Sequence, residues 1–162
     1  MEIGIALKAT NWLTLSGNYA YTNAKAKKGT QNTLGTIFGG NMSVAGFSLP
    51  RSPKHAAAGS AAVDLPTSWS GMRFFARADI TYQSRRYADL ANTIWADPFT
   101  HVNLSAGLRG QGWRGSLWVK NATNDDNALD GFSYLDGATF RNTAADFLPR
   151  RRQIGATVSY DF

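Results

Sequence analysis

The sequence comprises 162 residues, with a formal net charge of +6 and no cysteine. This length is sufficient for one domain with its own core, and the lack of cysteine excludes disulfide bonds and thiol chemistry. No run of about 18 apolar residues occurs, so no transmembrane helix is predicted. The opening segment, MEIGIALKAT, shows neither the basic nor the apolar region of a signal peptide. The excess positive charge favours an anionic partner: nucleic acid, anionic lipid or an acidic ligand.

Apolar and polar residues alternate with a period of two in seven segments. In the first segment Ile3, Ile5 and Leu7 share one side, opposite Glu2 and Lys8. Such alternation predicts β-strands with one apolar and one polar face. The predicted strands are residues 1–9, 12–22, 54–65, 72–83, 101–109, 113–120 and 153–162. Strands of this length suffice to cross a bilayer when tilted.

Short and long connections alternate strictly between these strands. Residues 10–11, 65–71 and 110–112 are tight turns rich in Gly, Pro, Ser and Asn. Residues 23–53, 84–98 and 122–149 are long connections. A soluble sandwich has no physical reason to place all its long loops at one end, whereas an outer-membrane barrel has short turns on one side and long loops on the other.

Aromatic residues gather at both ends of the predicted strands. Tyr19, Tyr21 and Tyr82 precede the long connections, and Trp12, Phe74, Trp113, Tyr160 and Phe162 lie near the short turns. Two belts of rings around an aliphatic middle are typical of the two interfaces of a membrane. We therefore expect the apolar face to look towards lipid and the polar face towards an enclosed interior.

Four stretches, in this order, resemble a known family: LTLSGNYAYTNAKAK, LPRSPKHAAAGSAAVDLP, VKNATNDD and RRRQIGATVSYDF. Together they resemble the C-terminal barrel part of TonB-dependent outer-membrane receptors. The resemblance implies an all-β fold, an antiparallel up-and-down meander of about seven strands, as a segment of a 22-stranded transmembrane β-barrel. Residues 1–162 are then the C-terminal segment of that barrel, and the plug domain and the N-terminal barrel strands have no counterpart in the sequence.

The number of predicted strands supports the same interpretation. Seven strands place the two ends of the sheet on opposite sides of a membrane and leave two open edges, which hydrocarbon does not tolerate. We therefore expect the sheet to be roughly the last third of a larger barrel.

The resemblance also implies location, function and partners. It implies a protein of the Gram-negative outer membrane that takes up a bulky nutrient, most commonly a ferric siderophore, with no enzymatic activity, cofactor or bound metal of its own. The implied partners are outer-membrane lipid and lipopolysaccharide, the plug domain and remaining barrel strands, TonB through the missing N-terminal region, and the barrel-assembly machinery. Since that machinery recognises the final strand, Tyr160 and Phe162 are candidate assembly signals.

Two sets of candidate site residues follow. Aromatic rings with a few cations suit flat, anionic chelates. The candidates for ligand contact in the long connections are Tyr87, Trp95, Phe132, Tyr134, Phe140 and Arg141, with packing among the loops as the alternative role. The candidates for the interior, facing the lumen or the plug, are Arg73, Arg77, Asp79, His101 and Trp118.

Other motifs favour plainer interpretations. The arginines at 150–152, taken as part of the last strand, lack the aromatic platform of a nucleic-acid site, so no nucleic-acid partner is expected. The segment NATNDDNALDG is better explained by turns than by a calcium loop, and the glycine-rich residues 35–41 by a flexible loop. Two alternatives to the receptor stay open, a small passive outer-membrane barrel or porin and a soluble β-sandwich binding module.

Overall fold

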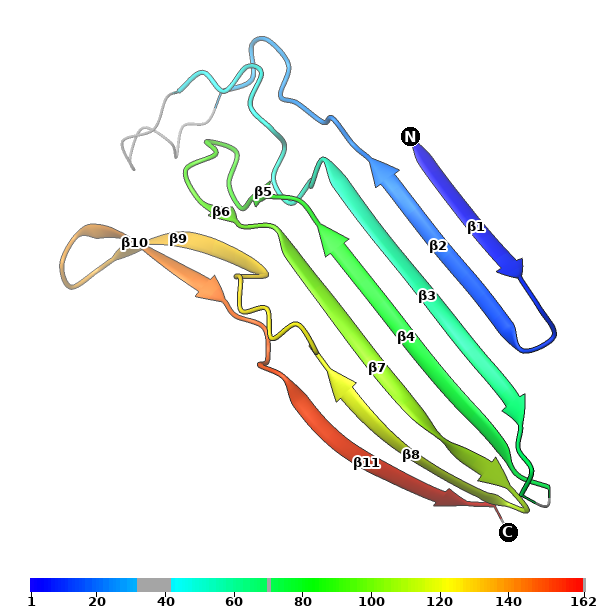
Figure 1. The fold of residues 1–162 in the computed structure, drawn as a ribbon. Helices are drawn as coiled ribbons and strands as arrows, with labels where there is room; N and C mark the ends of the chain where they lie inside the picture. Colours follow the sequence, from blue (N-terminus) through cyan, green and yellow to red (C-terminus); the bar gives the residue numbers. More distant parts are fainter. Residues whose placement is uncertain (32–41, 70, 162) are drawn as a thin grey trace.

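A computed structural model describes residues 1–31, 42–69 and 71–161. Residues 35–41, predicted as a flexible loop, and Phe162, a candidate assembly signal, lie outside the described residues. The described part folds into one seven-stranded antiparallel sheet and two small two-stranded sheets (Figure 1). No helix long and apolar enough to cross a membrane is found within these ranges.

The large sheet is a meander in which strands adjacent in space follow one another in the chain, apart from the small hairpins between them. Its strands are β1 (Glu2–Lys8), β2 (Leu13–Tyr21), β3 (His55–Pro66), β4 (Arg73–Gln83), β7 (Phe99–Gly110), β8 (Trp113–Lys120) and β11 (Gln153–Tyr160). The predicted seven-stranded all-β meander is thus confirmed. The sheet is open in this chain, with β1 and β11 at its edges (Figure 1).

The small sheets lie inside the long connections, where no strands were predicted. β5 (Arg86–Tyr87) pairs with β6 (Trp95–Ala96), and β9 (Asp130–Asp136) pairs with β10 (Arg141–Phe147). We call the connections β2–β3, β4–β7 and β8–β11 the first, second and third loops. All three leave the same end of the sheet, the loop end, while the tight turns lie at the opposite turn end (Figure 1).

Strand register keeps one side of the sheet apolar from edge to edge. One continuous row of directly opposed residues crosses all seven strands: Leu7, Leu15, Ala61, Ala78, Leu104, Val119 and Ile154. The adjacent row runs from Leu13 through Val63, Ala76, Ala106 and Leu117 to Ala156. We call this side the apolar face. A shift of one residue in any strand would move its apolar set to the other side.

The apolar face is uncovered in the described chain. Ile5, Leu117 and Val158 have exposed fractions of 65%, 68% and 69%. The buried hydrophobic side chains of the described part are Ala26, Val44, Ala91, Ala96 and Phe99, which lie in the loops or at the loop end. The apolar rows of the sheet therefore do not converge on a shared dry centre. A continuous exposed apolar surface of this kind requires an apolar environment or a partner.

A two-residue turn sets the register of β7 against β8. Gln111 and Gly112 both have positive φ, 51° and 78°, as a type I′ hairpin turn requires. Arg109 and Arg114 consequently stand directly opposite each other on the two strands.

A close approach of backbones explains the glycine at position 107. A Cβ added at Gly107 would lie 2.8 Å from the Ser116 Cα and 2.9 Å from the Phe75 Cζ. The Phe75 ring and the backbone of β8 therefore occupy the space that a larger residue would need.

We predict that Gly107→Ala destabilises the fold by about 1–3 kcal/mol, since the backbone of β8 would have to shift. Gly115→Ala is the matched control, because a Cβ there meets nothing within 4 Å. Thermal unfolding of the purified full-length variants measures the difference. Equal melting temperatures for the two variants would contradict this packing.

Candidate functional site

The other side of the sheet, the polar face, carries the charged side chains of the strands. The register places Arg73, Arg77 and Asp79 of β4, His101 of β7 and Trp118 of β8 on this one face. The five residues predicted to face the interior thus share a side. They do not form one cluster, because they are spread from the turn end to the loop end.

Arg77 and Asp79 form a self-contained pair near the middle of β4. The Arg77 Nε donates to Asp79 Oδ2 at 2.9 Å, and the second guanidinium nitrogen lies 2.6 Å from Oδ1. Two parallel bonds of this kind fix both groups and balance their charges. Beside them, the Ser16 and Ser60 hydroxyls are hydrogen-bonded at 2.7 Å.

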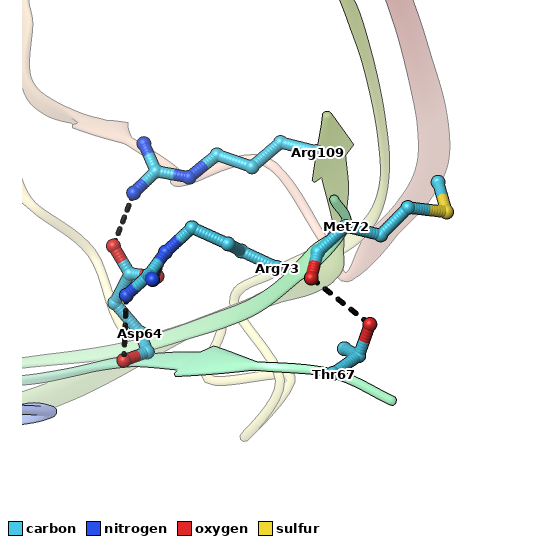
Figure 2. A network of polar contacts seen from close by, with 5 residues as sticks. All are labelled: Asp64, Thr67, Met72, Arg73 and Arg109. Atoms are coloured by element: carbon cyan, nitrogen blue, oxygen red, sulfur yellow. Dashed lines mark hydrogen bonds and ion pairs between the residues drawn. The ribbon is translucent and has the colours of Figure 1, made fainter. Parts of the chain in front are cut away.

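Asp64 joins two arginines at the turn end (Figure 2). The Arg73 Nε donates to Asp64 Oδ1 at 2.8 Å, and Arg109 forms an ion pair with Oδ2 of the same carboxylate. Arg73 was a predicted interior residue, whereas the sequence analysis did not single out Asp64 or Arg109. Below this network the Thr67 hydroxyl donates to the Met72 carbonyl at 2.9 Å and closes the turn.

Trp118 packs against its own sheet. A Cβ added at Gly155 of β11 would lie 2.7 Å from the Trp118 Cε2, so the indole covers this glycine. The indole N–H donates to the Thr157 hydroxyl at 3.2 Å, and the Lys120 ammonium lies 5.4 Å from the ring centroid. The wall itself thus accommodates this large ring on the polar face.

A recess of about 290 Å³ opens on the polar face near the loop end. Its lining includes four basic residues: His101, Lys120, Arg150 and Arg151. The His101 Nε2 is buried and has no hydrogen-bond partner within the described part of the chain. His101 was a predicted interior residue, and the pairing of β7, β8 and β11 brings Lys120, Arg150 and Arg151 to the same recess.

The three arginines, residues 150–152, precede β11. The prediction that they are part of the last strand is therefore wrong. They are held by the Asn- and Asp-rich segment after β8. Arg151 pairs with Asp126 at 2.6 Å, and the Arg152 amide donates to Asn124 Oδ1 at 3.0 Å. Within that segment the Asp125 amide donates to Asn121 Oδ1 at 3.0 Å, which confirms its predicted role in turn formation.

The predicted ligand residues form two groups in the loops. In the second loop Tyr87 stands opposite Trp95, and Arg85 lies over the Trp95 ring at 5.4 Å from its centroid. In the third loop Phe132 lies 5.8 Å from Tyr134 and 5.7 Å from Phe147 between ring centroids. Arg85 and Phe147 are members of these groups that sequence analysis missed.

Phe140 and Arg141 lie apart from both groups, at the tip of the β9–β10 hairpin. Phe140 has an exposed fraction of 78% and a φ of 51°. At this tip Thr139 donates to Asp136 at 2.7 Å, and this hydrogen bond is the main cause that lowers the pKa of Asp136 below its ordinary value. Because this pKa is lowered in the folded tip, the ionised carboxyl stabilises the tip at pH values above the ordinary pKa near 4. This stabilisation is lost as the pH falls through the lowered pKa.

Arg51 of the first loop ties the other two loops together. Its Nε donates to Asp130 Oδ2 at 2.8 Å, at the start of β9, and its amide donates to the Tyr87 carbonyl at 2.7 Å, in β5. Asn92 of the second loop exchanges two hydrogen bonds of 2.9 Å with the Ser48 backbone of the first loop. The two aromatic groups are therefore held in fixed relation by polar contacts.

Comparisons with solved structures find the same fold. The ferric yersiniabactin uptake receptor FyuA from Yersinia pestis matches with a TM-score of 0.74 and 16% identity, over 99% of this chain and 23% of that one. BauA, the ferric preacinetobactin receptor from Acinetobacter baumannii, matches with a TM-score of 0.65 and 19% identity, over 99% and 22% of the two chains. The siderophore receptor PiuA from Acinetobacter baumannii matches with a TM-score of 0.63 and 19% identity, over 98% and 21%.

This chain therefore spans less than a quarter of the length of these receptors. No curated protein sequence matches it. The family model described as TonB-dependent receptor-like, β-barrel, matches residues 1–122, which is most of the chain. Barrels of this family lie in the outer membrane of Gram-negative bacteria and are transport receptors, not enzymes. The chain thus belongs to the TonB-dependent receptor β-barrel family, and its sheet is a piece of outer-membrane barrel wall.

Proposed function

We propose that this chain is the C-terminal wall segment of a TonB-dependent receptor that takes up a bulky, anionic nutrient, a ferric siderophore. The supporting observation is the pairing of an uncovered, uncharged apolar face with a charged polar face below interlinked loops. Such a wall separates lipid from an interior and presents binding groups at one end. The soluble β-sandwich alternative is wrong, since the chain belongs to a membrane-barrel family.

The chemistry of the loop end favours an anionic, partly aromatic ligand. The recess supplies the basic groups Lys120, Arg150 and Arg151 and the unpaired His101 nitrogen. The loops above supply exposed rings at Trp95, with 47% exposure, and Tyr134, with 44%. Cations and ring faces together suit flat, negatively charged chelates. The solved structures with this fold are siderophore receptors, which supports the same ligand class.

Other segments of the receptor supply the parts that this chain lacks. The open edges of β1 and β11 need further strands, because unpaired backbone groups are not tolerated in hydrocarbon. Residues 1–162 are then the last strands of a barrel of about 22 strands, with a plug domain in its interior. A filled interior offers no diffusive path, which is why transport requires energy from TonB, acting through the N-terminal region.

Two further partners belong to the same proposal. The final strand with Tyr160 and Phe162 serves as the signal for the barrel-assembly machinery. Tyr160 lies 4.7 Å from Trp113 between ring centroids, at the turn end, where an interfacial aromatic belt is expected. Lipopolysaccharide contacts the basic first loop, which carries Lys25, Lys27 and Lys28. A passive porin remains the second candidate function, and transport measurements separate it from the receptor.

Uptake of radioactive iron from a panel of catecholate, hydroxamate and phenolate siderophores tests the function. Deletion of the full-length gene is expected to abolish uptake from one siderophore class, and TonB inactivation is expected to abolish the same uptake. Unchanged uptake of the whole panel after gene deletion would refute the siderophore receptor. Uptake that survives TonB inactivation would instead support a passive pore.

The aromatic groups of the loops generate a binding prediction. In the full-length receptor, Trp95→Ala combined with Tyr134→Ala is expected to weaken binding of the transported siderophore about tenfold, because ring contacts are lost. Trp69→Ala is the control: this tryptophan is 62% exposed but lies at the turn end. Ligand titration by intrinsic fluorescence measures the affinities. If the double variant binds as tightly as the control, these rings pack among the loops and do not contact ligand.

The assignment of the apolar face to lipid predicts how charged substitutions change the stability of the barrel. Leu117→Arg is expected to destabilise the folded barrel by about 2–4 kcal/mol if position 117 is near the bilayer midplane. Ser116→Arg, one residue earlier on the polar face, is expected to have a much smaller effect. Heat-dependent mobility of the full-length variants in gels reports their folding. Equal losses for both substitutions would contradict a lipid-facing Leu117.

A further inference from the structure

Three arginines from neighbouring strands oppose one another in a single row. Arg73 of β4 stands directly opposite Arg109 of β7, which stands directly opposite Arg114 of β8. We call them the arginine row; it lies on the polar face at the turn end. Directly opposed side chains have Cβ atoms about 4.5–5.5 Å apart, and like charges in such pairs destabilise a sheet. An arrangement of this kind needs negative charge from outside the row.

Asp64 supplies part of that negative charge, but it leaves some N–H donors of the arginines without an acceptor. Its two carboxylate oxygens take Arg73 and Arg109, and its carbonyl oxygen accepts a longer bond of 3.4 Å from Arg73. A guanidinium carries five N–H donors, so both arginines keep donors for a second acceptor. Their side chains are accordingly open, with exposed fractions of 45% and 46%.

Arg114 is held in place without a carboxylate. Its guanidinium lies over the Phe75 ring, 4.4 Å from the centroid, and that ring occupies the space beside Gly107. Arg114 forms no ion pair with any described residue. Stacking on a ring orients the planar guanidinium and leaves its edge free for bidentate binding of a carboxylate.

Along β4, the unbalanced charge lies at the turn end and not in the middle of the strand. In the middle of β4, Arg77 and Asp79 satisfy each other one to one. In the arginine row, by contrast, two guanidinium groups share the one carboxylate of Asp64, and the third lies over the Phe75 ring without a carboxylate among the described residues. The row spans three adjacent strands, which is about 10 Å at the usual strand spacing. It therefore offers room for two carboxylates side by side.

We propose that the arginine row docks an acidic segment of the domain that fills the barrel interior, through at least two Asp or Glu carboxylates. The inference rests on the proposed function, which supplies such a domain. The row lies at the end of the sheet opposite the ligand-facing loops, so a polypeptide held in the interior fits it better than the transported ligand. Successive same-side residues of an extended segment lie about 7 Å apart, a spacing that the row accommodates.

Carbodiimide cross-linking tests the proposal in the full-length receptor isolated from outer membranes. Arg114→Lys introduces an amine that a carbodiimide joins to a carboxylate in contact with it. Mass spectrometry is expected to find this position joined to an Asp or Glu of the interior domain. Replacing that acidic residue by its amide is then expected to abolish the cross-link. Arg77→Lys is the matched control and is expected to join only to Asp79, if it reacts at all.

The outcomes separate this inference from the proposed function. A receptor that contains an interior domain but shows no cross-link from position 114, or one confined to β3, β4, β7 and β8, overturns the inference alone. An outer-membrane barrel that contains no interior domain overturns the proposed function as well.

Discussion

Backbone hydrogen bonds between neighbouring strands hold the row from Leu7 to Ile154 on one side of the sheet, and every functional feature depends on that register. Because side chains alternate across a strand, fixing the aliphatic rows on one side fixes all polar residues on the other. The uncovered Leu, Ile and Val side chains would be a liability in water, whereas hydrocarbon removes that cost. The same register brings Arg73, Arg109 and Arg114 into line.

The loops add a second level of order to this wall. A few of their small hydrophobic side chains, such as Val44 and Ala96, are buried, although the sheet itself has no covered core in the described part. Arg51 and Asn92 join loops that are far apart in sequence. Hydrogen bonds between the loops therefore hold the aromatic groups of the second and third loops in position. Binding groups held in this way lose less conformational freedom when a ligand arrives. The polar recess lies near these loops, at the loop end of the polar face.

Much of the fold followed from the sequence, because period-two alternation over long segments is a strong and local signal. The β9–β10 hairpin escaped prediction for the same reason. Its strands are only seven residues long and include Asp130, Asp136 and Asp146. The hairpin is stabilised by the pairing of its two strands and by the Arg51 contact from the first loop, which a local pattern does not record. The assignment of Arg150–Arg152 to the last strand was wrong, because the Asn- and Asp-rich segment holds them before β11.

The polar contacts of the site were harder to predict from the sequence. The pairing of Arg109 with Arg114 could have been derived, since both flank a two-residue turn at Gln111 and Gly112. The addition of Arg73 could not, because its register against β7 depends on the geometry of the long second loop between β4 and β7. The position of Trp118 over Gly155 likewise required knowing which residue of β11 lies opposite it.

The orientation of the two faces is tested most directly by spin labels along β7 in the full-length receptor in bilayers. Residues 1–162 contain no cysteine, so once any cysteine elsewhere in the receptor is replaced, single labels can be attached at Val102→Cys, Asn103→Cys, Leu104→Cys, Ser105→Cys and Ala106→Cys. Positions 102, 104 and 106 should be accessible to oxygen dissolved in lipid, and positions 103 and 105 should be shielded from it. A uniform response along the strand, or oxygen access at the odd positions, would contradict a wall whose aliphatic side faces the membrane.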